Sequence, residues 1–241
     1  MENNLKFVKY HLPCPACNSS DALSLNENGS AKCFSCDKFF PKYNVNTTVP
    51  IGEPRVEAIN SHGGVYAPLS DRSISKQTAE KYRVKSIFDN QGVIAQHLYP
   101  LYINNELTAI KIRYIKDKRF SFEGSSTGTG LFGQNLFKEG GKYITITEGE
   151  CDAMAAYELL GSKWAVVSIK NGAAGAVNNI KENLEYIESF DNVVISFDSD
   201  KEGREAAVKV ARILKPGKAK ILNLPTGFKD ANEMLVKKEY D

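Results

Sequence analysis

The chain has 241 residues, of which 42% are hydrophobic and 25% charged, and its formal net charge is +2. This composition is typical of folded globular protein, and the length allows one large domain or a few small ones. The nearly balanced charge predicts no overall polycationic surface, so a nucleic-acid contact would need a local basic patch. We see no long apolar run and no signal peptide, which predicts a cytoplasmic protein with no membrane partner.

Four of the five cysteines lie close to the start of the chain, as two CxxC pairs. Cysteine usage in a cytosolic chain favours metal binding over disulfides, and two pairs with this separation are typical of a closed, tetrahedral structural Zn²⁺ site. Redox cysteines are the alternative. We predict a zinc-binding module at residues 1–43 that holds one Zn²⁺ per chain through Cys14, Cys17, Cys33 and Cys36.

The segment between the two cysteine pairs is long enough for a β-hairpin with Asn28–Gly29 as its turn. So small a module cannot build an adequate core, so the metal would supply much of its folding free energy. Because a closed site is structural, the function of the module would be a binding surface. Lys32 is a candidate contact for single-stranded DNA. We expect the rings of Phe34 and Phe39 to pack within the module.

Residues 44–60 contain two prolines and several small polar residues without apolar periodicity, which predicts a linker. The next segment, residues 61–140, is predicted to form the N-terminal subdomain of the core. Its pattern indicates a short capped helix at 73–83 and two strands, 93–103 and 107–115, joined by a tight turn.

The second of these strands begins a basic run that continues into the following turn. Strand alternation places Lys111 and Arg113 on one face, and Lys118 and Arg119 follow. This run could bind the phosphates of a nucleotide or a template, and a solvated strand edge protected by lysines is the alternative. The glycine-rich loop at 124–133 is not followed by Gly-Lys-Ser/Thr, so it is not a Walker loop.

Residues 141–241 alternate between strand and helix patterns, which predicts a mostly parallel sheet with right-handed crossovers. The predicted fold class is therefore α/β in this region, and α+β overall once the small β module is included. We expect Trp164 in the core and Cys151 packed at a helix start. The predicted strands are 143–147, 164–169, 193–197 and 220–224, and the predicted helices are 151–160, 178–190 and 202–214.

Two acidic motifs each follow an apolar strand of this half, EGECD at 148–152 and DSDKE at 198–202. The carboxyl ends of parallel strands meet at one edge of a sheet, so these carboxylates should converge there. Oxygen ligands of this kind suit Mg²⁺, usually together with substrate phosphates. Either motif alone would be an ordinary surface loop or a helix-dipole complement. Together they predict a cation site formed by Glu148, Asp198 and Asp200.

A tight turn formed by Lys170, Asn171 and Gly172 follows another predicted strand, and its backbone N–H groups could face phosphate. The two acidic motifs resemble the signatures of the Toprim fold, which bacterial-type primases, topoisomerases and some nucleases share. The cysteine module narrows the resemblance to DNA primases. The stretches SIKNGAA at 168–174 and KDANE at 229–233 resemble the primase half of the bifunctional primase–helicases of short-tailed phages.

The resemblance implies a DNA-directed RNA polymerase of the primase type, with residues 141–241 as its Toprim subdomain. Such an enzyme uses Mg²⁺ or Mn²⁺ to join ribonucleoside triphosphates into short RNA primers on single-stranded DNA, in the cytoplasm of an infected bacterium. The implied partners are a replicative helicase, fused or in trans, and a DNA polymerase. A Toprim nuclease or strand-cleaving enzyme and a non-catalytic single-strand DNA adaptor are the alternatives.

The resemblance also implies residue roles. Glu148 would be the general base, Asp198 and Asp200 would bind the catalytic metal, and Asp230 would be a further acidic residue of the site. Triphosphate or template would be bound by the basic residues of the middle segment, namely Lys111, Arg113, Lys118 and Arg119.

Overall fold

The structure, a computed structural model, describes residues 6–16, 22–34, 38–44 and 63–238. The chain divides into two units, Met1–Val56 and Glu57–Asp241, and each is described by itself. The division falls within the segment predicted to be a linker, most of which lies outside the described residues. None of the helices in the described part of the chain has the length and apolar character needed to cross a membrane.

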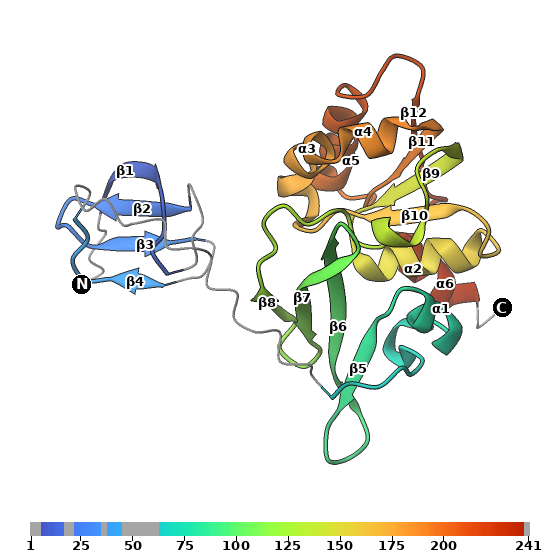
Figure 1. The fold of residues 1–241 in the computed structure, drawn as a ribbon, viewed down its shortest axis with the longest axis horizontal. Coiled ribbons are helices and arrows are strands. Elements are labelled where there is room, and N and C mark those ends of the chain that lie inside the picture. Colours follow the sequence, from blue (N-terminus) through green and yellow to red (C-terminus); the bar gives the residue numbers. More distant parts are fainter. Residues whose placement is uncertain (1–5, 17–21, 35–37, 45–62, 239–241) are drawn as a thin grey trace. The chain divides into compact units, whose positions relative to one another are not determined.

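The N-terminal unit is a four-stranded antiparallel sheet in the order β1-β2-β3-β4 (Figure 1). The predicted hairpin is confirmed, because β2 and β3 pair across a turn in which Gly29 adopts a φ of 81°. The small core contains Leu23, Leu25 and Ala31 together with two of the cysteines. The strands are β1 (Phe7–Leu12), β2 (Leu23–Asn26), β3 (Ala31–Cys33) and β4 (Phe39–Phe40).

The second unit begins with an antiparallel sheet in the order β5-β6-β7-β8. The predicted turn between the two long strands is confirmed, with Asn104 and Asn105 both at positive φ, which a two-residue hairpin turn requires. The predicted capped helix is α1 (Lys76–Lys81), where the Ser75 side chain accepts a hydrogen bond from the Thr78 N–H. The strands are β5 (Lys85–Phe88), β6 (Ile94–Ile103), β7 (Glu106–Tyr114) and β8 (Arg119–Gly124).

A fully parallel sheet follows, in the order β10-β9-β11-β12. Figure 1 shows α3, α4 and α5 on one face of this sheet and α2 and α6 on the other. The predicted α/β class with a mostly parallel sheet is confirmed. The elements are β9 (Gly141–Thr147), α2 (Glu150–Leu159), β10 (Ala165–Ser168), α3 (Gly172–Glu182), α4 (Leu184–Glu188), β11 (Phe190–Ser196), α5 (Lys201–Ala211), β12 (Ala219–Ile221) and α6 (Ala231–Lys238).

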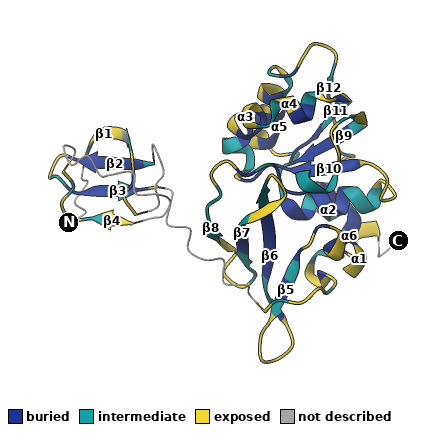
Figure 2. Cartoon of the chain, in the orientation of Figure 1, coloured by how far each residue is buried: buried dark blue, intermediate teal, exposed yellow. Residues whose placement is uncertain are grey.

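The two sheets of the second unit share a core through α2. Met154 of α2 packs in one cluster with Val166 of β10 and Tyr99 of β6. The hydroxyl of Tyr82, just after α1, donates to the Val166 carbonyl at 2.9 Å. Figure 2 shows α2 and the central strands as largely buried. This shared core fixes the end of β9, where the first acidic motif begins, relative to the basic strand β7.

Two sequence predictions are wrong in this half. The helix predicted at 178–190 is two helices that begin at Gly172, and Phe190 starts β11. The predicted helix starts too late, and a Cβ on Gly175 would lie 2.8 Å from the Asn171 Cβ, so glycine is what permits the first turn of this helix. Trp164 is 39% exposed and not a core residue, because it precedes the edge strand β10.

The prediction that Phe34 and Phe39 pack within the N-terminal module is wrong for Phe39 and holds only in part for Phe34. Both rings are exposed. The core of this module is filled by shorter side chains, and the ring of Phe34 contacts the ring of Phe7 edge-on with 5.6 Å between the centroids. The unit therefore presents aromatic rings on its surface.

Candidate active site

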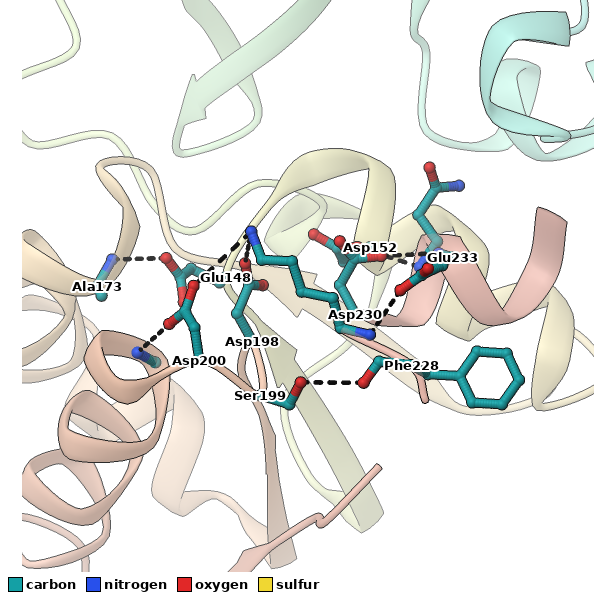
Figure 3. A network of polar contacts seen from close by, with 12 residues as sticks. Glu148, Asp152, Ala173, Asp198, Ser199, Asp200, Phe228, Asp230 and Glu233 are labelled. Atoms are coloured by element: carbon teal, nitrogen blue, oxygen red, sulfur yellow. Dashed lines mark hydrogen bonds and ion pairs between the residues drawn. The ribbon is translucent and has the colours of Figure 1, made fainter. Parts of the chain in front are cut away.

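The two acidic motifs come together at a crevice between neighbouring strands. Glu148 follows β9, and Asp198 and Asp200 follow β11, which pairs directly with β9. After β9 the chain enters α2 on one face of the sheet, and after β11 it enters α5 on the other. Ligands bind at this reversal point in open α/β sheets. Asp230, just before α6, is drawn beside them in Figure 3.

The two carboxylate oxygens of Glu148 differ in their hydrogen bonding. Its Oε1 accepts a hydrogen bond of 3.1 Å from the Ala173 N–H at the start of α3. Its Oε2 is buried and has no hydrogen-bond partner among the described residues. Burial and the negative charge of Asp198 raise the pKa of Glu148. The side chain is therefore held in place with an acceptor atom left over for a proton or a cation.

Asp198 and Asp200 face a lysine. The Lys229 Nζ lies 3.0 Å from Oδ2 of Asp198 and 3.7 Å from Oδ2 of Asp200. The other oxygen of Asp200 accepts a hydrogen bond of 2.9 Å from the Gly203 N–H and caps α5. Burial raises the pKa of Asp198, its hydrogen bond from Lys229 opposes this effect, and Asp230 adds to it.

Gly203 lets the DSD loop and α5 approach each other closely. A Cβ at this position would lie 2.3 Å from the carbonyl oxygen of Asp198. No side chain fits there without moving the backbone that carries Asp198. The glycine of this motif therefore has a steric role in placing the two aspartates.

Asp152 is a site residue that the sequence predictions missed. It is half-buried, and its Oδ1 accepts a hydrogen bond of 3.1 Å from the Asn232 N–H in α6. Burial, with the charges of Asp230 and Asp198, raises the pKa of Asp152 to about 8. The available signal was the acidic motif at 148–152 itself, which places Asp152 in the first turn of the helix that follows Glu148.

The crevice thus gathers more negative charge than its surroundings neutralise. Oxygen donors of this type suit a hard divalent cation. A raised pKa at three of the carboxyls and a buried oxygen without a partner are what such a site shows before a cation is bound. Among the described residues, no three acidic, histidine or cysteine side chains are arranged around one point. The carboxylates are Glu148, Asp152, Asp198, Asp200 and Asp230.

Lys111 lies inside the unit. Its Nζ lies 2.7 Å from the Glu150 Oε1 and donates to the Lys170 carbonyl at 2.8 Å. Lys111 and Arg113 do share one face of β7, since both charged groups lie within 6.0 Å of the Phe120 ring centroid, at 4.7 and 5.9 Å. Of the two, Lys111 is paired with a buried acid, so phosphate contact by its ammonium stays a prediction.

Lys170 fixes the glycine-rich loop. Its Nζ donates to the carbonyl and the hydroxyl of Thr129, at 2.6 and 3.0 Å. Burial lowers the pKa of Lys170. Asn171 is exposed and Gly172 adopts a φ of 63° at the start of α3. The turn 170–172 is thus anchored by its lysine, and the exposed side chain in it is that of Asn171.

The remaining predicted basic residues have no hydrogen bond or ion pair with these carboxylates among the described contacts. Lys118 and Arg119 occupy the turn and the start of β8, and both are exposed. The Arg119 guanidinium stacks 3.4 Å above the Tyr114 ring centroid. Lys32 belongs to the N-terminal unit, where its Nζ lies 5.8 Å from the ring centroid of Phe34.

The predicted zinc site is described only in part. Cys14 and Cys33 are buried in the core of the N-terminal unit, and the Ala16 N–H donates to the Cys14 Sγ at 3.4 Å. Backbone N–H donation to a cysteine sulfur two residues earlier fits a thiolate ligand. Cys17 and Cys36 lie outside the described residues.

A buried polar row joins the first sheet to the start of α2, and sequence reasoning assigned it nothing. The His97 Nε2 lies 3.1 Å from Oδ1 of Asp71, and its Nδ1 lies 3.0 Å from the Tyr99 hydroxyl. That hydroxyl lies 3.3 Å from the Cys151 Sγ. Cys151 is buried, as expected of a packed residue.

Comparisons with known proteins agree with this architecture. A family model described as Toprim-like matches residues 145–235. The chain is 34% identical over 236 residues to the DNA helicase/primase of Enterobacteria phage T3, and the match covers 93% of this chain and 40% of that protein. The chain therefore spans less than half the length of this curated relative.

Two solved structures are also similar. The primase fragment of the bacteriophage T7 primase-helicase protein is 34% identical, with a TM-score of 0.69 over 98% of this chain and 97% of that one. The second belongs to a bacteriophage T7 complex in which a lagging-strand DNA polymerase interacts with primase domains of two gp4 subunits bound to an RNA/DNA hybrid and dTTP. That chain is 36% identical, with a TM-score of 0.66 over 73% of this chain and 87% of that one.

Proposed function

Because the chain belongs to the family of phage primase–helicases and matches their primase part, we propose that it is a DNA primase that makes short RNA primers on single-stranded DNA. The resemblance indicated by the sequence motifs is thereby confirmed at the level of the family. The observation that carries the proposal is the group of under-neutralised carboxylates at the reversal point of a Toprim-like sheet.

The reaction would be nucleotidyl transfer, in which a ribose 3′-hydroxyl attacks the α-phosphorus of a ribonucleoside triphosphate and pyrophosphate leaves. Asp198, Asp200 and Glu148 would hold a divalent cation, Mg²⁺ or Mn²⁺. When bound, the cation would neutralise phosphate charge and lower the pKa of the attacking hydroxyl. Asp152 and Asp230 would complete the acidic surroundings.

Glu148 would act as the general base. The hydrogen bond from Ala173 fixes one oxygen, so the buried Oε2 is the atom that would accept the proton of the 3′-hydroxyl. This division of labour fits phosphoryl chemistry, which depends on positioning and charge more than on covalent help.

The basic residues would bind substrate phosphates in two ways. Arg113, Lys118 and Arg119 would contact the triphosphate or the template directly. Lys111 and Lys170 would act mainly by fixing the turn 170–172, in which Asn171 and the backbone of Gly172 would face a phosphate.

The N-terminal unit would hold one structural Zn²⁺ through Cys14, Cys17, Cys33 and Cys36. Its exposed rings, Phe34 and Phe39, would stack on unpaired bases, with Lys32 beside them. A replicative helicase, fused or in trans, and a DNA polymerase would be the protein partners, as the names of the phage T3 and T7 relatives suggest. The proposed location is the cytoplasm of an infected bacterium.

The test is a product assay with the full chain, a single-stranded DNA library, labelled ribonucleoside triphosphates and Mg²⁺ or Mn²⁺. Wild type should yield short oligoribonucleotides, and Glu148→Gln should lower the yield by about 10²- to 10⁴-fold, as expected for loss of a general base. Glu202→Gln is the matched control, because Glu202 is an exposed acid in the first turn of α5.

The other functions give other products. Cut template without new RNA would indicate a nuclease, and bound DNA without either product would indicate an adaptor. Either result would contradict the proposal, and so would full activity of Glu148→Gln.

A further inference from the structure

Lys229 is fixed by its backbone but not by its side chain. Its N–H donates to the Glu233 Oε2 at 2.6 Å, and its carbonyl accepts from the Ser199 N–H at 2.8 Å. The first bond ties the loop before α6 to that helix, and the second holds it against the DSD loop. The side chain is 57% exposed and extends to Asp198 and Asp200, the ion pairs of the network drawn in Figure 3. The ammonium can therefore leave the aspartates without disturbing the loop.

We propose that Lys229 is an internal counter-ion that competes with a divalent cation for Asp198 and Asp200. The inference rests on the proposed function, which assigns the cation to these aspartates. Two cations bound to the same pair of carboxylates repel each other strongly at separations of about 4 Å. Binding of the divalent cation thus requires the ammonium to withdraw, and the crevice keeps partial neutrality until that happens.

The experiment measures Mn²⁺ binding to the zinc-loaded full chain, from the electron paramagnetic resonance signal of free Mn²⁺. Lys229→Met should bind Mn²⁺ about fivefold more tightly than wild type, a modest gain because the exposed ammonium is screened by solvent. Lys215→Met is the matched control. That lysine also pairs with a carboxylate, Glu188, at 2.8 Å, and it follows the far end of α5.

The outcomes separate this inference from the proposed function. Equal or weaker Mn²⁺ binding by Lys229→Met, in a background where Asp198→Asn abolishes binding, overturns the counter-ion and leaves the cation site intact. An equal gain in Lys215→Met also overturns it, since the effect would then be one of net charge. No Mn²⁺ binding by wild type overturns both.

A second inference concerns an apolar groove of about 520 Å³ on the sheet face that carries α2 and α6. Thr145 of β9 and Val194 of β11 lie side by side in its floor. Its walls include Leu160 after α2, Trp164 before β10, and Leu222 after β12, all of which are exposed. Contiguous apolar surface of this kind marks an interaction site.

Four lysines neighbour lining residues of this groove, and we call them the lysines of the rim. Lys220 pairs with Val194 across the sheet and so shares its face, and Lys238 lies one helical turn after the lining residue Met234. The Lys142 Nζ lies 5.7 Å from the ring centroid of Tyr143, another lining residue, and Lys163 immediately precedes Trp164.

The acids closest in sequence to the groove have other partners. The Glu158 Oε1 accepts from the backbone N–H and the hydroxyl of Ser75. Glu233 pairs with Lys237 at 3.1 Å, and Asp230 accepts from the backbone N–H of Glu233. The lining residues themselves are uncharged. The lysines of the rim are therefore left to attract an acidic ligand.

From this combination we infer that the groove binds an acidic amphipathic helix of a partner protein. Leucine-type anchors at positions i, i+3, i+4 and i+7 would enter the groove. Glutamates flanking that apolar face would meet the lysines of the rim, which sets the choice between acidic and basic partners.

Trp164 reports on the groove directly, because it is the single tryptophan of the chain. The probe is a synthetic helical peptide with leucines at these positions and glutamates elsewhere, titrated into the full chain while Trp164 fluorescence is followed. A saturable change is expected, with at least tenfold weaker binding when the glutamates are replaced by lysines. Leu222→Glu should abolish binding, whereas Val208→Glu should not; Leu222 and Val208 are 46% and 41% exposed, and Val208 lies on α5, across the sheet.

Three results would overturn the inference. Equal binding of the acidic and basic peptides would remove the role of the lysines. Full binding by Leu222→Glu would place the peptide elsewhere. A fluorescence change with protein concentration alone would make a second copy of the chain the occupant.

Discussion

Two lysine–carboxylate pairs in the second unit differ in burial and in how completely their charges are balanced. The side chains of Lys111 and Glu150 are 11% and 5% exposed and lie 2.7 Å apart, and the ammonium also donates to a backbone carbonyl. Lys229 is largely exposed and meets Asp198 at 3.0 Å, where other carboxylates surround the pair. The first pair is compensated and permanent. The second leaves a net negative charge that a single ammonium does not balance.

The contrast teaches how to separate scaffold from chemistry in a charged protein. A buried ion pair whose ammonium also donates to a backbone carbonyl holds elements in register, here β7, α2 and the turn after β10. A group of acids with raised pKa values and an unpartnered oxygen is costly to keep, and a ligand relieves that cost.

Removing one partner of the buried Lys111–Glu150 pair should reduce stability much more than removing one partner of the exposed Lys229–Asp198 pair. Lys111→Met leaves Glu150 buried without its counter-charge, so the free energy of unfolding should fall by about 3–5 kcal/mol. Lys229→Met should cost less than about 1 kcal/mol, because that pair is exposed. Urea unfolding followed by Trp164 fluorescence measures both. Equal losses would mean that the two pairs are not different in kind.

A larger residue at position 203 tests whether close packing of α5 against the DSD loop places Asp198. In Gly203→Ala the new methyl group would lie 2.3 Å from the carbonyl oxygen of Asp198, which is too close for two non-bonded atoms. The expected loss is about 1–3 kcal/mol of stability, as for an overpacked site, together with a larger loss of primer synthesis because Asp198 moves. Gly63→Ala is the control of similar chemistry, since Gly63 has no positive φ and no atom lies within 4 Å of a Cβ there. Normal activity of Gly203→Ala would contradict the close approach.

The pH dependence of stability should report the crowded acids. Burial and neighbouring charge raise the pKa of Asp152 to about 8, so between about pH 4 and pH 8 the folded chain binds more protons than the unfolded chain. Stability without added divalent cation should therefore fall as the pH rises through this window. Asp152→Asn should remove about 1–2 kcal/mol of that fall between pH 5 and pH 8.

Another acid acts in the opposite direction but in a different window. Hydrogen bonding from Lys215 lowers the pKa of Glu188, so its contribution is present above about pH 4.5 and is lost at more acidic pH. Measurements between pH 5 and pH 8 thus lie outside the window in which the contribution of Glu188 changes. An unchanged slope in Asp152→Asn would show that this acid is not the source.

Local pattern was enough to predict the strands β6, β7, β9 and β11, and with them the edge where the acidic motifs meet. Alternating elements dictate a parallel sheet, and a parallel sheet dictates that residues after its strands converge. The spacing of glycine and asparagine predicted both hairpin turns for the same kind of reason.

The remaining features depend on contacts between distant residues. Lys111 can be buried because Glu150 and the Lys170 carbonyl accept hydrogen bonds from its ammonium. These partners lie 39 and 59 positions away in the sequence, so no local pattern indicates them. The sequence alone does not distinguish Asp152 from an ordinary acid at a helix start. Its place in the site depends on the contact with Asn232 of α6, which is 80 positions away. Trp164 was predicted to be buried as a large apolar residue, but it precedes an edge strand, and the local sequence does not show which strand is at the edge.

The most direct test of the account removes one acid from each pair and measures synthesis and stability together. In the full chain with Mn²⁺, Asp198→Asn should lose primer synthesis by about 10³-fold or more, and its urea midpoint should be unchanged or higher, because repulsion in the crevice is relieved. Glu150→Gln should have a clearly lower midpoint and keep its synthesis rate within about tenfold. Wild-type synthesis by Asp198→Asn, or a loss of synthesis in Glu150→Gln without a loss of stability, would contradict the division between scaffold and chemistry.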